Sequence, residues 1–191
     1  GTRTRWLLAG AGSAAVFVVV YISFMGYAGD RVTAWLHPEL DPGDTGYQIL
    51  QSLYAIGSGG LFGLGYGKSR QKYLYLPFQY NDYIFAVICE ELGLVGAMAI
   101  VALFAVTILR GYWIALNARD RFSTVLAAGL VTLIAVQTIL NLCVVTNLLP
   151  STGIALPFFS YGGTALAVNL GEMGIVLGIS RGRNRRKIQE A

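Results

Sequence analysis

Asp82 is the first residue whose type and position suggest chemistry. It lies in the run LPFQYNDYIF, where a mixed polar segment gives way to a long apolar one. A carboxylate at the mouth of a membrane span is partly removed from water, which raises its pKa. Such a group can act as a general base or hold a cation. The alternative is that an acid at the start of a helix only complements the helix dipole.

Three cations precede this aspartate within five residues of one another, namely Lys68, Arg70 and Lys72. Cations just outside a membrane can hold a lipid phosphate or a pyrophosphate, or can simply extend toward the headgroups of surrounding lipid. The glycine-rich run before them does not form a nucleotide P-loop, because Phe62 stands where that motif needs its first glycine. The glycines instead allow the backbone to approach another surface closely.

Three further carboxylates, Glu90, Glu91 and Glu172, fall inside predicted membrane spans. Ionisable groups inside a span are costly and therefore mark functional hypotheses, here a possible intramembrane polar site at Glu91 and Glu172. Neighbouring positions on a helix point about 100° apart, so only one of Glu90 and Glu91 can face the centre of the same cavity. A polar contact between helices is the alternative for each carboxylate.

The composition determines which elements must position these residues. Of 191 residues, 55% are hydrophobic and 13% are charged, and the mean hydropathy is +0.59. These values exclude a disordered chain and argue against an ordinary soluble enzyme. They predict an all-α integral membrane protein with a single membrane domain over 1–191 and four transmembrane helices. We expect these helices at about 6–25, 83–109, 122–149 and 163–179.

The distribution of charge orients the predicted helices. The segments before the first span, between the second and third, and after the fourth are basic, whereas the loop 26–82 carries five acidic against four basic residues. The positive-inside rule then places both ends in the cytoplasm, with a cytoplasmic tail at 180–191. It also predicts a large extracellular loop at 26–82 and an extracellular turn at 150–162. The basic tail faces anionic lipid, so nucleic acid is not an expected partner.

Two parts of the predicted outer face have their own patterns. Residues 47–61 have apolar side chains at 49, 50, 53, 54 and 56 with Gln48, Gln51 and Ser52 opposite, which predicts a helix. This helix lies either in the membrane interface or against the bundle. The turn 150–162 contains prolines and glycines that prevent a simple helix, and irregular backbone at this depth is tolerated where it is buried or lines a cavity. The turn and the long loop 26–82 lie on the same face, and together they are expected to roof an outward-facing pocket that contains Asp82.

Three ordered runs in the chain resemble the SEDS family (shape, elongation, division and sporulation), nearer its FtsW/SpoVE branch. The runs are GYQILQSLYAIGSGGLFGLGYGKSRQKYLYLP, NDYIFAVICEELGLVGA and LLPSTGIALPFFSYGGTA, and the resemblance covers about residues 26–181. Members of the family have ten membrane helices. The resemblance implies that this chain is the C-terminal portion of that fold, with the large extracellular loop between helices seven and eight. The portion is not expected to act alone.

The resemblance implies a peptidoglycan glycosyltransferase at the outer face of the bacterial cytoplasmic membrane, in cell division or sporulation. Such enzymes join lipid II into glycan strands and work with a class B penicillin-binding protein, a transpeptidase. The family's essential aspartate matches Asp82. Positions implied to meet the substrate match Ser69, Gln71, Lys72, Ser160, Gly162 and Gly163, and Arg70 joins them by its charge.

One departure from the family pattern is Phe78, which stands after Pro77 where the family usually has Glu. The resemblance therefore does not carry a role of that Glu in handling metal or substrate over to this position. No cofactor is implied with certainty, although pyrophosphate chemistry is compatible with a divalent cation such as Mg or Mn. Two other functions stay open: a lipid II flippase or transporter, and a non-catalytic scaffold for the transpeptidase.

Overall fold

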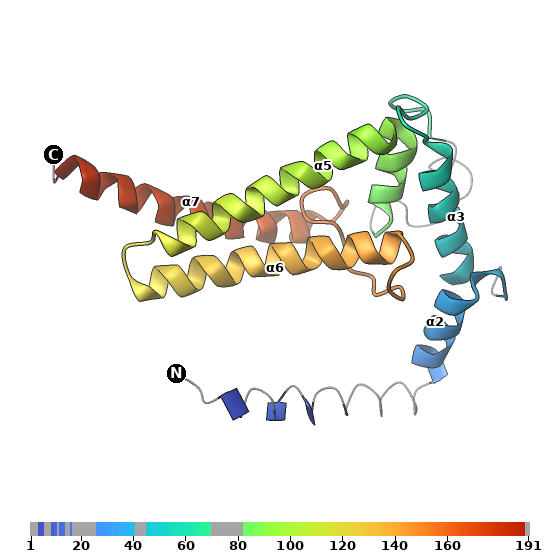
Figure 1. The fold of residues 1–191 in the computed structure, drawn as a ribbon, viewed down its shortest axis with the longest axis horizontal. Coiled ribbons are helices and arrows are strands. Elements are labelled where there is room, and N and C mark those ends of the chain that lie inside the picture. Colours follow the sequence, from blue (N-terminus) through green and yellow to red (C-terminus); the bar gives the residue numbers. More distant parts are fainter. Residues whose placement is uncertain are drawn as a thin grey trace.

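The computed structural model describes residues 4–5, 9–10, 12–13, 16, 26–40, 45–69 and 82–189. This part of the chain consists of helices and connecting segments and contains no strand. Three long helices lie side by side and two shorter ones cross one end of them (Figure 1). The long helices are α5 (Ile84–Leu116), α6 (Arg121–Val145) and α7 (Gly163–Gln189).

These three helices fall where three of the four spans are predicted. Each is long and apolar enough to cross a membrane, α7 through its part Gly163–Gly182. The helix α5 extends seven residues beyond the end predicted for the second span, and α6 ends four residues before the end predicted for the third. The first predicted span, 6–25, lies largely outside the described residues.

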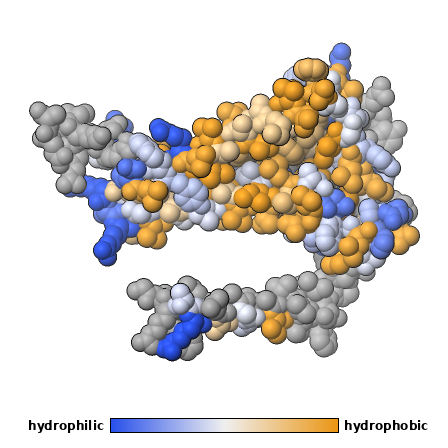
Figure 2. Space-filling model, in the orientation of Figure 1, coloured by the Kyte–Doolittle hydropathy of each residue, from blue (hydrophilic) through white to orange (hydrophobic). Residues whose placement is uncertain are grey.

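Apolar side chains cover the sides of the bundle, as a lipid-facing surface requires. Figure 2 shows this apolar surface over α5 and α6, with hydrophilic residues toward the ends of the bundle. On α5 the large exposed side chains include Leu94, Val95, Met98, Leu103, Val106 and Leu109. So much contiguous exposed apolar surface is not compatible with a water-soluble globule, and the fold is that of a multi-pass membrane protein.

The connection between α5 and α6 is short and carries a well-formed cap. Asp120 accepts hydrogen bonds from the backbone nitrogen of Ser123 at 2.9 Å and from its hydroxyl at 2.8 Å. These bonds hold the pKa of Asp120 below its ordinary value. The cap satisfies amide groups that the first turn of a helix leaves without partners, so α6 begins at Arg121.

Two shorter helices and a single 3-10 turn lie at the other end of the bundle. They are α2 (Gly26–Leu36), η1 (Pro38–Leu40) and α3 (Thr45–Ser58). The indole of Trp35 on α2 donates to the carbonyl of Asn147 at 3.0 Å. The hydroxyl of Ser52 on α3 donates to the carbonyl of Val145 at 3.1 Å. Both contacts attach these helices to the end of α6, so the described part of the predicted loop contains helices that pack on the bundle.

The helix predicted within 47–61 is confirmed, but the face assigned to it is wrong. Ile49, Ser52 and Ala55 are the buried positions, at 1% or less exposure, whereas Tyr54 is 59% exposed. Beside Ile49, the buried contact is made by the small side chains of Ser52 and Ala55 rather than by Tyr54. This is the usual basis of helix packing in membranes, where burying apolar surface gains little and close approach of backbones gains more.

The helix α5 is broken at Gly93, which has φ 67° and ψ −171°. The segment after α3 enters this break. The amides of Leu64 and Gly65 donate to the carbonyls of Glu90 and Glu91 at 2.9 and 3.0 Å. In return, residues 94 and 95 donate to the carbonyls of residues 60 and 61 at 2.9 and 3.1 Å. The backbone groups freed by the break are thus satisfied inside the protein, which is the condition for interrupting a membrane helix.

Candidate functional site

Asp82 lies directly before α5, at the end of the bundle that α2 and α3 cross. Its side chain is partly buried. Removal from water raises the pKa of the Asp82 carboxyl above its ordinary value, and the positive charge of Arg31 on α2 opposes that shift. The carboxyl therefore holds a proton more readily than an exposed aspartate does, which is the property required of a general base working near neutral pH.

The irregular segment between α6 and α7 forms one wall beside this carboxyl. The guanidinium of Arg31 donates from Nη1 to the carbonyl of Ser151 at 2.9 Å, and the hydroxyl of Tyr83 donates to Oγ of Ser151 at 3.4 Å. Gly153 has φ 69°, and a Cβ atom placed on it would lie 3.7 Å from Oδ2 of Asp82. These contacts place part of the segment 150–162 beside Asp82, and a roofed pocket around Asp82 stays a prediction.

Asn141 on α6 joins the same two segments from inside the bundle. Its side chain is fully buried, and its Nδ2 donates to the carbonyl oxygens of Asp82 at 2.7 Å and of Ile154 at 2.8 Å. Sequence reasoning did not single out Asn141, Arg31 or Ser151. An asparagine within a largely apolar helix is the available signal for the first of these. In the sequence, Arg31 is only one of the four basic residues of the loop 26–82.

Ser160 lies in a pocket of about 440 Å³ bounded by α6, the segment 154–160 and the start of α7. Its walls are mainly apolar, with polar groups from Gln137, Thr164 and Asn169. Gly162 donates its amide to the carbonyl of Ser160 at 2.9 Å, and Gly163 is the first residue of α7. Asp82 does not line this pocket. Of the predicted SYGG positions, Ser160 therefore lines a cavity beside α7 that does not include the carboxylate.

Ser69 lies at the break in α5. Its hydroxyl donates to the carboxylate of Glu90, and the two side chains are 2% and 1% exposed. This buried hydrogen bond closes the loop that enters the break. The other predicted substrate positions on this loop, Arg70, Gln71 and Lys72, lie outside the described residues, as does Phe78.

Glu91 and Glu172 are buried within their helices, at 7% and 8% exposure. One carboxylate oxygen of each has no hydrogen-bond partner among the described residues. Asn169 precedes Glu172 by one turn and is 7% exposed. Within the described part of the chain, no three His, Cys, Asp or Glu side chains converge as ligands for a metal ion.

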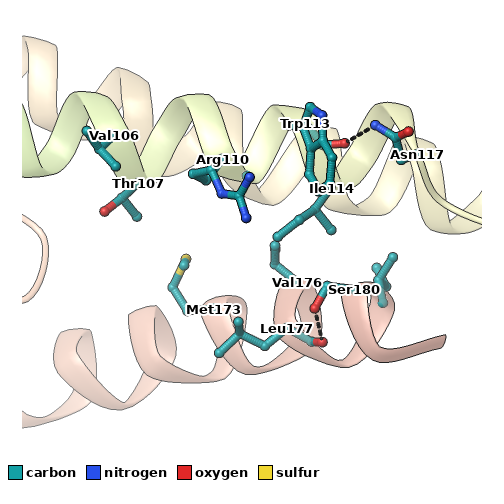
Figure 3. A pocket seen from close by; sticks show the side chains of 12 residues that line it. Val106, Thr107, Arg110, Trp113, Ile114, Asn117, Met173, Val176, Leu177 and Ser180 are labelled. Atoms are coloured by element: carbon teal, nitrogen blue, oxygen red, sulfur yellow. Dashed lines mark hydrogen bonds between the residues drawn. The ribbon is translucent and has the colours of Figure 1, made fainter. Parts of the chain in front are cut away.

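A second pocket, of about 420 Å³, lies between α5 and α7 toward the end of the bundle away from Asp82. Figure 3 shows the guanidinium of Arg110 pointing into the space between the two helices. Its Cζ lies 4.7 Å from the ring centroid of Trp113. Arginine and tryptophan at the end of a membrane helix are typical anchors at the lipid headgroup level, so this pocket is separate from the candidate site.

The family model described as "Cell cycle protein", which covers FtsW, RodA and SpoVE, matches residues 1–185. The chain belongs to the SEDS family. Two similar SEDS relatives are the stage V sporulation protein E of Bacillus subtilis and a probable peptidoglycan glycosyltransferase FtsW of Trichlorobacter lovleyi. The first is 50% identical over 79% of this chain and 41% of its own length. The second is 44% identical over 95% of this chain and 48% of its own length.

A solved SEDS structure has a similar fold. It belongs to a study of how a peptidoglycan synthase complex coordinates polymerization and crosslinking. The match has a TM-score of 0.74 and 29% identity, and covers 94% of this chain and 49% of that one. The present chain therefore spans about half the length of the SEDS proteins it matches. The predicted family and the all-helical membrane fold are confirmed.

Proposed function

We propose that this chain is part of a peptidoglycan glycosyltransferase that joins lipid II units into glycan strands, with Asp82 as its general base. The observation that carries the proposal is the partly buried Asp82 carboxyl, with its raised pKa, between Arg31 and the segment around Gly153. The names of the FtsW relatives support the same activity.

The reaction requires few groups from the protein. A sugar hydroxyl of one lipid II attacks the anomeric carbon of another, a new glycosidic bond forms, and the bond from that carbon to the pyrophosphate breaks. Asp82 takes the proton of the attacking hydroxyl. The negative charge that develops on the departing pyrophosphate needs cations. Lys72 and Arg70 are the residues proposed for that task. The substrate contacts that stay predictions are Ser69, Gln71, Ser160, Gly162 and Gly163.

The charge of Arg31 gives the proposal a pH signature. The base must be ionised to accept a proton, so the rate falls as the pH drops below the pKa of Asp82. Arg31 lowers that pKa. An Arg31→Gln variant should therefore lose activity at a higher pH than wild type, whereas Arg31→Lys, which keeps the charge, should stay close to wild type. Initial polymerisation rates across the acidic range measure the shift. If the acidic side of the pH–rate profile shifts equally in Arg31→Gln and Arg31→Lys, the electrostatic role of Arg31 is contradicted.

The surroundings of the reaction follow from the same proposal. The site faces the outside of the bacterial cytoplasmic membrane, both ends of this chain lie in the cytoplasm, and the protein serves cell division or sporulation. The partner is a class B penicillin-binding protein, which the similar synthase complex supports by coupling polymerization to crosslinking. The described residues contain no cluster of His, Cys, Asp or Glu side chains that could bind a divalent cation beside the pyrophosphate.

The test is a polymerisation assay on the full-length protein, meaning a chain of the relatives' length that contains residues 1–191. It is purified with its penicillin-binding partner, whose transpeptidase site is inactivated so that only strand synthesis is observed. Labelled lipid II should be converted into glycan strands. If no strands form while lipid II crosses sealed vesicles that contain the protein, the transporter function replaces the polymerase. Complex formation without either activity supports the scaffold.

The transporter is kept as a second candidate because of Glu91 and Glu172. Each holds a carboxylate oxygen that is buried within a membrane helix and has no partner among the described residues. Intramembrane carboxylates of this kind are typical of proton or ion pathways. A transporter predicts that Glu91→Gln and Glu172→Gln lower lipid II movement across the vesicle membrane. A polymerase predicts that strand synthesis depends on Asp82 instead.

A further inference from the structure

Asn141 occupies a position that the proposed reaction has not used so far. It lies near the end of α6, its side chain is fully buried, and one nitrogen atom donates to two main-chain carbonyls, of Asp82 and Ile154. Both acceptors are carbonyl oxygens, so the side chain must present its NH₂ group to them. The orientation of the amide is therefore determined by its partners.

The two carbonyls belong to segments that are far apart in the chain. Asp82 is 59 residues from Asn141 and Ile154 is 13 residues from it. One carbonyl belongs to the proposed catalytic residue. The other belongs to the neighbour of Gly153, whose Cβ position would be 3.7 Å from the Asp82 carboxylate. A single amide thus fixes the spacing between the carboxylate and the wall that faces it.

We propose that Asn141 is a positioning residue, which holds the main chain of Asp82 against the segment around Ile154 so that the carboxylate points at the reacting hydroxyl. This inference rests on the proposed function of Asp82. Asn141 does not touch the substrate and acts only through Asp82. A misplacement of about 1 Å at a reacting group can cost on the order of 100-fold in rate, so losing one buried amide is sufficient for a large effect.

The chain offers a matched control one turn earlier on the same helix. Thr138 is 3% exposed, and its hydroxyl donates to the carbonyl of Ile134 within α6 at 2.8 Å. Thr138→Val removes a buried polar group of α6 without touching either outer segment. Asn141→Ala removes the bridge. A comparison of the two separates the loss of positioning from the general cost of altering the interior of this helix.

The experiment measures kcat and KM for lipid II polymerisation by the full-length protein with its partner. We expect Asn141→Ala to lower kcat at least tenfold while KM stays within twofold of wild type. Thr138→Val should keep both values within twofold. Asn141→Ser, whose hydroxyl can bond one carbonyl but not both, should fall between wild type and Asn141→Ala. If Asn141→Ala is not recovered as a folded complex, the kcat of Asn141→Ser tests the positioning role instead.

The outcomes separate this inference from the function on which it rests. Wild-type kcat in Asn141→Ala, or in Asn141→Ser if only that variant folds, overturns the positioning role while Asp82→Asn stays inactive. An equal loss in the Asn141 and Thr138 variants also overturns it, because the effect is then one of helix packing. Full activity of Asp82→Asn overturns the catalytic assignment of Asp82 itself, whatever the Asn141 variants do.

Discussion

The Asp82→Asn variant of the full-length protein should lose polymerisation by about 10²- to 10⁴-fold, which is the range that a positioned general base contributes. Asparagine keeps the size and shape of the side chain but cannot take a proton from the attacking hydroxyl. The main-chain carbonyl of residue 82 is unchanged, so its bond with Asn141 is retained. The measurement is the initial rate of glycan strand formation from labelled lipid II, with copurification of the partner as proof of an intact complex.

A second aspartate provides the control for this substitution. Asp120 caps α6 at the opposite end of the bundle and is fully exposed to solvent. Asp120→Asn makes the same chemical change outside the candidate site, and it should leave the polymerisation rate within twofold of wild type. Equal rates in wild type, Asp82→Asn and Asp120→Asn mean that Asp82 only begins a helix. A large loss of rate in both Asp82→Asn and Asp120→Asn means that each substitution acts by destabilising the protein.

The long apolar helices were predictable because a membrane imposes a simple requirement on the sequence. A span needs about 20 apolar residues, and such runs are visible without knowledge of the fold. The break in α5 was not predictable in the same way. In the sequence this region is marked only by the carboxylates Glu90 and Glu91, whereas the chain deviates at Gly93. The position of the break depends on where the glycines of the loop after α3 can fit against α5. That fit is a property of the packed structure.

The candidate site was predictable only in its centre. Asp82 stood out because it lies where a polar segment meets an apolar span, and the family motif contains the same aspartate. Its neighbours did not stand out, since Ser151 and its partner Arg31 are separated by 120 residues. Ser52 was assigned to the exposed side of its helix and is instead fully buried. Polarity alone misleads wherever a small hydroxyl can bond a carbonyl of the neighbouring helix.

The glycines of the loop that enters the α5 break give the second large prediction, now for stability. Gly63 has φ 77°, and a Cβ there would lie 2.2 Å from the carbonyl oxygen of Glu91. That contact is with backbone atoms, which cannot rotate away. Gly63→Ala should therefore force the loop out of the break. The backbone hydrogen bonds between this loop and α5 should then be lost. We expect a loss of at least about 3 kcal/mol, from overpacking together with the positive φ.

Two neighbouring glycines separate the steric clash from the effect of backbone conformation. Gly60 also has a positive φ, 54°, but a Cβ there meets nothing within 4 Å, so Gly60→Ala should cost only about 1–2 kcal/mol. Gly57 lies within α3 and has open space around it, so Gly57→Ala should be neutral or stabilise the helix by up to about 1 kcal/mol. Thermal unfolding of the purified full-length variants should rank Gly57→Ala highest and Gly63→Ala lowest. If Gly63→Ala unfolds at the same temperature as Gly60→Ala, the loop is not seated in the break of α5, because only the clash distinguishes these two positions.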